Sequence, residues 1–138
     1  MIKERYCSYE LSKLLEEKGF NEEVRTYYQF DNETKYVELI HDDRLDTPNS
    51  WGGDYVSAPT HQMACDWLRE HGFHINVFIC YDYSVDADGN EVDRRTFYTF
   101  EISSSFSGEL IYTEQVNEYD SNEEAVEDAL KYCLTKLI

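Results

Sequence analysis

The chain has 138 residues, in which 29 acidic and 12 basic side chains give a formal net charge of −17 at pH 7. Hydrophobic residues make up 41% of the chain and charged residues 30%, a composition typical of a globular domain and not of a disordered chain. The negative charge argues against nucleic-acid binding through a basic field and against anionic membrane surfaces, because both require lysine and arginine.

The first part of the chain predicts a helix followed by a hairpin. Ser8 can cap a helix through about residue 18, where Gly19 fits a left-handed C-cap. Two strand-like segments follow at 24–30 and 35–41, and the turn-forming residues 31–34 join them.

From residue 42 to residue 59 the pattern dissolves into a segment with both prolines, a glycine pair and Trp51. Its 18 residues exceed the length of roughly 12–15 at which structureless loops become uncommon. The sequence therefore predicts a loop that is functional or partly disordered. A tryptophan in such a loop can anchor a partner protein, or it can pack back onto the sheet.

The second part predicts a helix from Thr60 to about residue 71, strands at 74–83, 95–102 and 109–113, and a last helix from Ser121. Apolar side chains alternate along the first of these strands and share one face: Ile75, Val77, Ile79, Tyr81 and Tyr83.

The order of elements is α-β-β-α-β-β-β-α over residues 1–138, taken as a single acidic domain. Short turns link successive strands, so we expect an α+β fold with a largely antiparallel sheet of about five strands. The three helices are expected to pack on one face of that sheet.

No apolar run approaches the ~20 residues of a membrane helix, and the N-terminal residues lead into polar sequence instead of a signal core. The cysteines are far apart, without a C-x-x-C pair, and are expected as free buried thiols: Cys7, Cys65, Cys80 and Cys133. We therefore expect a cytoplasmic protein without contact to membranes.

Acidic residues dominate the last third of the chain. Between Arg95 and Lys131 there are nine acids and no base. Acids in the first turns of the last helix suit its positive end, and Glu127 has Lys131 four residues on. The other acids predict an unscreened negative face, which either keeps the protein soluble or docks a basic partner. The candidate protein-binding residues are Trp51, Asp54, Tyr55, Glu118, Asp120, Glu123, Glu124, Glu127 and Asp128.

We expect no metal and no cofactor. The acidic turn at 86–90 has part of a calcium-loop pattern, but Arg95 stands where the bidentate glutamate belongs, so a hairpin turn is favoured. The pair His71 and His74 lacks further ligands at zinc-like spacing.

His61 and Cys65 form the one nucleophile–base pair that the sequence offers, because residues four apart on a helix can touch. Asp66 lies beside the cysteine, where a thiolate needs positive charge instead. The chain is therefore expected to be no enzyme, with a small enzyme or ligand-binding domain using these two residues as an alternative.

Four segments carry a resemblance: SYELSKLLEEKGF at 8–20, APTHQMACDWLREHGFHI at 58–75, YDYSVDADGN at 81–90 and YDSNEEAVEDALKY at 119–132. Together they resemble a group of small proteins of unassigned function that phages and prophages of gut bacteria encode. The resemblance implies an accessory protein of a mobile element and supplies no catalytic residues.

The leading hypothesis is thus a non-enzymatic accessory protein that binds another protein through the aromatic loop or the acidic face. Its partner would be basic if the acidic face is used. A second hypothesis is an acidic DNA mimic that inhibits a host DNA-binding protein. Neither hypothesis involves direct nucleic-acid binding by this chain.

Overall fold

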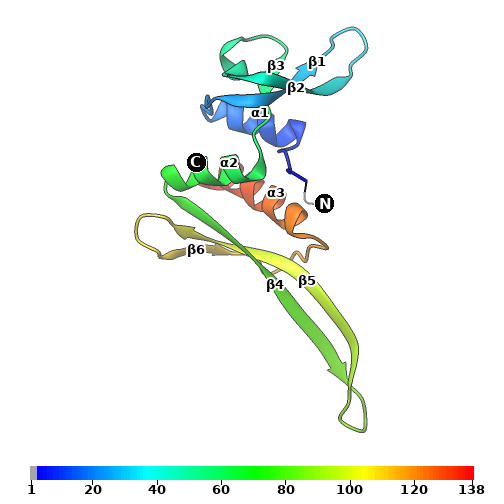
Figure 1. Ribbon diagram of the computed structural model, residues 1–138. Coiled ribbons are helices and arrows are strands. Elements are labelled where there is room, and N and C mark those ends of the chain that lie inside the picture. The colour runs from blue at the N-terminus through cyan, green and yellow to red at the C-terminus, as the bar shows by residue number, and fades with distance from the viewer. Residues whose placement is uncertain (1–2) are drawn as a thin grey trace.

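The computed structural model describes residues 3–138 and has an α+β fold, with helices between two antiparallel sheets (Figure 1). The α-helices are α1 (Tyr9–Glu17), α2 (His61–Glu70) and α3 (Asn122–Tyr132), and a π-helical turn (Cys133–Leu137) follows α3. The N-terminal sheet has the order β2-β1-β3, with β1 (Val24–Phe30), β2 (Val37–Asp46) and β3 (Tyr55–Ser57). The C-terminal sheet has the order β4-β5-β6, with β4 (Phe73–Val85), β5 (Glu91–Ser104) and β6 (Leu110–Thr113).

Each α-helix begins at the capping residue that the sequence predicts. The side-chain oxygens of Ser8, Thr60 and Ser121 accept hydrogen bonds from backbone N–H groups in the first helical turn, each at 3.2 Å. At the ends of α1 and α2, Gly19 and Gly72 have φ of 95° and 100°, which glycine adopts without strain. None of the helices in residues 3–138 is long and apolar enough to cross a bilayer.

Side chains from the helices and from both sheets meet in one buried core. α1 lies against the inner side of the N-terminal sheet, and α2 and α3 lie against the C-terminal sheet (Figure 1). Among the largest fully buried side chains of this core are Leu11, Leu15, Phe20, Leu68, Phe100, Ile102, Leu130 and Leu134. Removing this apolar surface from water is the main favourable term that holds the layers together.

The prediction of a single sheet with about five strands is wrong. The described chain has six strands in two sheets, and the helices cover one face of each sheet. The sequence gives no signal for β3, which is three residues long, follows a glycine pair and forms by pairing with β1. Because α2 follows β3 and leads the chain away from β1, β4 starts a second sheet.

The predicted loop over 42–59 is shorter in the structure. The last residues of β2 are exposed and, apart from Leu45, polar, so no hydrophobic alternation marks them in the sequence. Residues 47–54 remain between β2 and β3, and they include a short 3-10 turn (Pro48–Ser50). Asn49 fixes this turn to β3, because its N–H donates to Ser57 Oγ at 3.1 Å and its Oδ1 accepts from the Ser57 N–H at 2.7 Å.

β4 and β5 form a long hairpin that extends well beyond the helices (Figure 1). At its tip the carboxylate of Asp86 accepts hydrogen bonds from the backbone N–H groups of Asp88 and Asn90, each at 2.9 Å. The acidic turn is therefore the predicted hairpin turn, and the Asp86 carboxylate is engaged by the backbone.

Removing one of two buried hydroxyl groups should raise the free energy of unfolding, and removing the other should lower it. Ser12 Oγ is buried in α1 without a hydrogen-bond partner in the described chain, whereas Thr26 Oγ1 donates to Ala58 O at 2.6 Å. Ser12→Ala should raise the free energy of unfolding by about 0.5 kcal/mol, because alanine favours the helix and leaves no orphaned hydroxyl. Thr26→Val should lower it by about 1–2 kcal/mol. Urea unfolding measures the free energy of unfolding of both variants. Equal losses of stability in the two variants would contradict the difference between the two hydroxyl groups.

Candidate functional site

The outer face of the N-terminal sheet carries a cluster of three aromatic rings. Tyr28 of β1 donates its hydroxyl to Cys7 O at 2.6 Å on the helix side. Because side chains alternate along a strand, Tyr27 points to the other, outer face. The ring centroid of Trp51 lies 5.0 Å from that of Tyr27 and 5.4 Å from that of Tyr55, both edge to face. Such pairs are favourable beyond their buried area.

Trp51 is packed and accessible at the same time. Its ring rests on two tyrosines of the sheet, yet 41% of the residue is exposed. The bonds of Asn49 to Ser57 hold the preceding turn in place. Trp51 therefore covers part of the sheet and also leaves part of its ring free to contact a partner.

An acidic hollow of about 420 Å³ adjoins this cluster. Four carboxylates line it, with no lysine or arginine among its lining residues: Asp31, Glu33, Glu38 and Asp54. Gln29 also lines the hollow, and its amide donates to the Tyr55 hydroxyl at 3.5 Å, which places the hollow beside the rings. We call the three rings and four carboxylates the aromatic–acidic surface.

Local hydrogen bonds hold two of these carboxylates. The Asn32 amide donates to Asp54 at 2.9 Å, and the Glu33 backbone N–H donates to Asp31 at 2.9 Å. The backbone bond from Glu33 is the largest cause that lowers the pKa of Asp31, so this exposed group stays ionised well below neutral pH.

Five of the six acids predicted for the C-terminal face line one cavity, of about 590 Å³. It lies between the N-terminal segment, the start of α2 and α3, and these acids are Glu118, Glu123, Glu124, Glu127 and Asp128. Asp120 is not among the lining residues. Five of the six candidate acids thus lie around one cavity, and their role in binding a protein stays a prediction.

Two of the acids pair with arginines. Arg95 donates from Nη1 and Nη2 to the two oxygens of Glu118, at 2.5 and 3.0 Å. Arg5 Nε lies 3.8 Å from a carboxylate oxygen of Glu123. Arginine lowers the pKa of Glu118 in this bidentate pair.

Two further acids accept hydrogen bonds from neutral groups. Glu124 accepts from the Asp120 backbone N–H at 3.2 Å, and Asp128 accepts from the Tyr119 hydroxyl. The two arginines therefore offset part of the predicted negative face, whereas these neutral donors hold two carboxylates in place without removing their charge.

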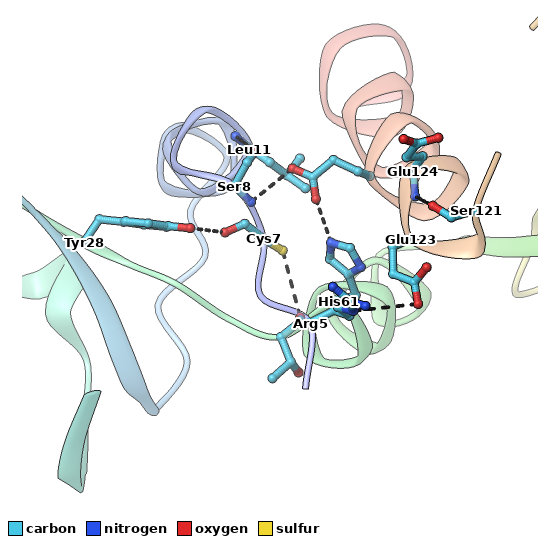
Figure 2. A network of polar contacts seen from close by, with 11 residues as sticks. Arg5, Cys7, Ser8, Leu11, Tyr28, His61, Ser121, Glu123 and Glu124 are labelled. Atoms are coloured by element: carbon cyan, nitrogen blue, oxygen red, sulfur yellow. Dashed lines mark hydrogen bonds and ion pairs between the residues drawn. The ribbon is translucent and has the colours of Figure 1, made fainter. Parts of the chain in front are cut away.

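Glu127 of α3 has one partner at the start of each of the other two α-helices, and Figure 2 shows these partners, Ser8 and His61, turned toward α3. From α3, its Oε1 accepts from the Ser8 backbone N–H at 3.0 Å, and its Oε2 lies 2.6 Å from His61 Nε2. Ser8 caps α1 and His61 is the first residue of α2. Burial works against ionisation, but the bonds from His61 and Ser8 outweigh it and lower the pKa of Glu127. The predicted pairing with Lys131 is wrong, since that lysine lies 3.4 Å from Glu10.

His61 and Cys65 do not form a nucleophile–base pair. His61 is turned to Glu127, and no hydrogen bond within residues 3–138 joins it to Cys65. Both line a hollow of about 320 Å³, but Cys65 also packs against the apolar core. Burial raises the pKa of its thiol to about 11, the opposite of what a nucleophilic thiolate requires.

The two neighbouring histidines have separate partners. His71 Nδ1 lies 2.8 Å from Trp67 O, and His74 Nδ1 accepts from Arg69 Nε at 3.3 Å. Within residues 3–138, no group of three or more His, Cys, Asp or Glu side chains could hold a metal ion.

The sequence identifies three of the seven residues of the aromatic–acidic surface. It names Trp51, Asp54 and Tyr55, but it misses Tyr27 and the carboxylates of the β1–β2 hairpin. The alternation along β1, which separates Tyr27 from Tyr28, contains the signal for the third ring.

Comparison of the chain with protein-family models, with curated proteins and with solved structures gave no significant match. The function is therefore inferred from the geometry described above.

Replacing the carboxylate of Glu127 should cause a loss of stability that depends on pH. Glu127→Gln should lower the free energy of unfolding at pH 7 by about 1–3 kcal/mol, because charged hydrogen bonds are lost. The folded-state pKa of Glu127 is lowered, so its contribution is present above the ordinary value of 4.5 and is lost as pH falls through the folded value. The deficit of the variant, measured by urea unfolding, should therefore shrink below that pH.

Glu123→Gln is the matched control, since Glu123 lies on the same helix and is half exposed beside Arg5. It should cost less than about 1 kcal/mol at every pH. A pH-independent deficit for Glu127→Gln, or equal deficits for both variants, would refute the role of Glu127.

Proposed function

We propose that this chain is a non-enzymatic binding module that takes a basic segment of another protein on the aromatic–acidic surface. The observation that carries the proposal is the exposed Trp51, packed on two tyrosines, of which Tyr55 contacts Gln29 at a hollow lined by four carboxylates and by no lysine or arginine. This combination of groups suits an arginine or lysine side chain.

The chemistry of recognition follows from these groups. A guanidinium or ammonium group is attracted to the face of an aromatic ring and to a carboxylate, and both lie within one small area here. The rings already pack on one another, so binding costs little further side-chain entropy. Tryptophan and tyrosine are the residues that most often dominate binding energy at protein interfaces.

The net charge of −17 supports the same partner. A strongly negative protein attracts basic partners over distances of about a Debye length and repels acidic ones. Long-range attraction would speed association, and the aromatic–acidic surface would then supply the short-range contacts.

The other hypotheses receive less support from the geometry. A DNA mimic needs a surface of carboxylates without bases among them, whereas Arg95 pairs with Glu118 and Arg5 lies beside Glu123. An enzyme using His61 and Cys65 lacks the hydrogen bond between them and the lowered thiol pKa. An accessory role for a phage or prophage in the bacterial cytoplasm is part of the proposal, and the resemblance of the helices and turns supports it.

A peptide titration tests the proposal. Fluorescent peptides with arginine or lysine at two or three positions should bind, and peptides with glutamate at the same positions should not. Trp51→Ala with Tyr55→Ala should raise the dissociation constant at least about tenfold, the loss of about 1.4 kcal/mol. Phe106→Ala is the aromatic control, since that ring is exposed in the turn between β5 and β6, away from the N-terminal sheet.

Charge is tested separately. Glu38→Gln with Asp54→Asn should weaken binding of the basic peptides, while Glu16→Gln with Glu17→Gln on α1 changes the net charge equally and should not. Unchanged binding in the Trp51 and Tyr55 variant would overturn the proposal. Binding that persists unchanged at 1 M salt would also count against it, because charge attraction is screened there.

A further inference from the structure

The hairpin of β4 and β5 carries an apolar stripe that its own helices cover only in part. Near the helices, Phe73, Ile75 and Val77 pack against the core. The same face continues toward the tip with four large side chains that are exposed by 59%, 49%, 46% and 59%: Ile79, Tyr81, Tyr83 and Val85. Figure 1 shows this part of the hairpin projecting away from every other element. A two-stranded ribbon of this kind is marginally stable in water by itself.

β4 is the edge strand of its sheet, and its pairing shows which backbone groups are free. Tyr98 of β5 uses both its N–H and its C=O to pair with Tyr119 on the side away from β4. Ile79 lies opposite Tyr98, so its own N–H and C=O point outward from the free edge of β4. The same holds for Val77, because the C=O of its partner Phe100 accepts from Glu114. Alternate residues of β4 thus offer unpaired donors and acceptors to another strand.

Most of this edge is free of charge, up to Asp82 near the far end of β4. Residues 71–81 contain no Asp, Glu, Lys or Arg, although 30% of the chain is charged. Two copies with a net charge of −17 each repel one another through most surfaces. Along β4 they can meet without placing acids opposite acids, which would be destabilising. A basic partner would gain no charge attraction at this edge, so the edge suits a second copy of the chain.

We propose that two copies of this chain pair antiparallel through their β4 edges around a two-fold axis. The two C-terminal sheets then form one six-stranded sheet, in which the outward N–H and C=O groups of Ile79 and its neighbours are satisfied. A two-fold axis perpendicular to the sheet keeps the apolar stripes of both copies on the same face. The same surface patch serves both copies, as symmetric dimers require. This interface lies on the other sheet from the aromatic–acidic surface and does not depend on it.

Paired proline variants test the edge. Ile79→Pro removes an outward N–H from β4 and no hydrogen bond within the hairpin, a position where an edge strand tolerates proline. Thr96→Pro is the matched control: Thr96 lies opposite Tyr81, so its N–H points outward from the other edge of the same hairpin. Ile79→Asp is a second variant that keeps the backbone intact and places an acid at the interface. Circular dichroism checks that each variant is folded.

Sedimentation velocity over a concentration series measures the outcome. Wild-type protein and Thr96→Pro should form dimers, whereas Ile79→Pro and Ile79→Asp should raise the dimer dissociation constant at least about tenfold. If Ile79→Pro unfolds, the Ile79→Asp result decides. A wild-type protein that stays monomeric up to about 1 mM, the affinity of the weakest specific contacts, would overturn the proposal. Dimers that persist in the folded Ile79 variants would also overturn it, since the interface would then lie elsewhere.

Discussion

The carboxylate of Glu127 joins the beginnings of two helices to a third, between the two sheets. Ser8 and His61 are 119 and 66 residues away from Glu127 in the chain, yet each contacts one of its two carboxylate oxygens. α1 carries the N-terminal sheet, and α2 leads directly into β4. A half-buried carboxylate with two partners thus links the three helices that lie between the sheets (Figure 1), beside the apolar core that holds the layers together.

Placing the helices between the sheets leaves the outer sides of the molecule for other roles. One outer face carries Trp51 and its two tyrosines beside a hollow of carboxylates. The other sheet extends past the helices as a hairpin with an uncovered apolar stripe and a free edge. Several acids of the C-terminal third, by contrast, have partners within the chain, and a docking role for this face stays a prediction.

The sequence predicts well what depends on neighbours in the chain. The caps at Ser8, Thr60 and Ser121, the turn at 86–90 and the meander of β4 to β6 follow from local patterns, and the structure confirms them. It does not predict β3 or the second sheet, because a three-residue strand exists through its pairing with β1. Nor does it predict the partners of Glu127. A sequence places Glu127 four residues from Lys131, and only the packing of the helices brings Ser8 and His61 to it instead.

The role of Glu127 is tested most directly by an NMR pH titration that follows its carboxyl carbon together with the Ser8 amide proton. The amide proton donates to this carboxylate, so its chemical shift should report the same ionisation. Both signals should titrate together, with a midpoint below the ordinary glutamate value of 4.5, because the bonds from His61 and Ser8 favour the charged form. A Ser8 amide that does not respond to the ionisation of Glu127, or a midpoint above 4.5, would contradict the role of this carboxylate in joining the three helices.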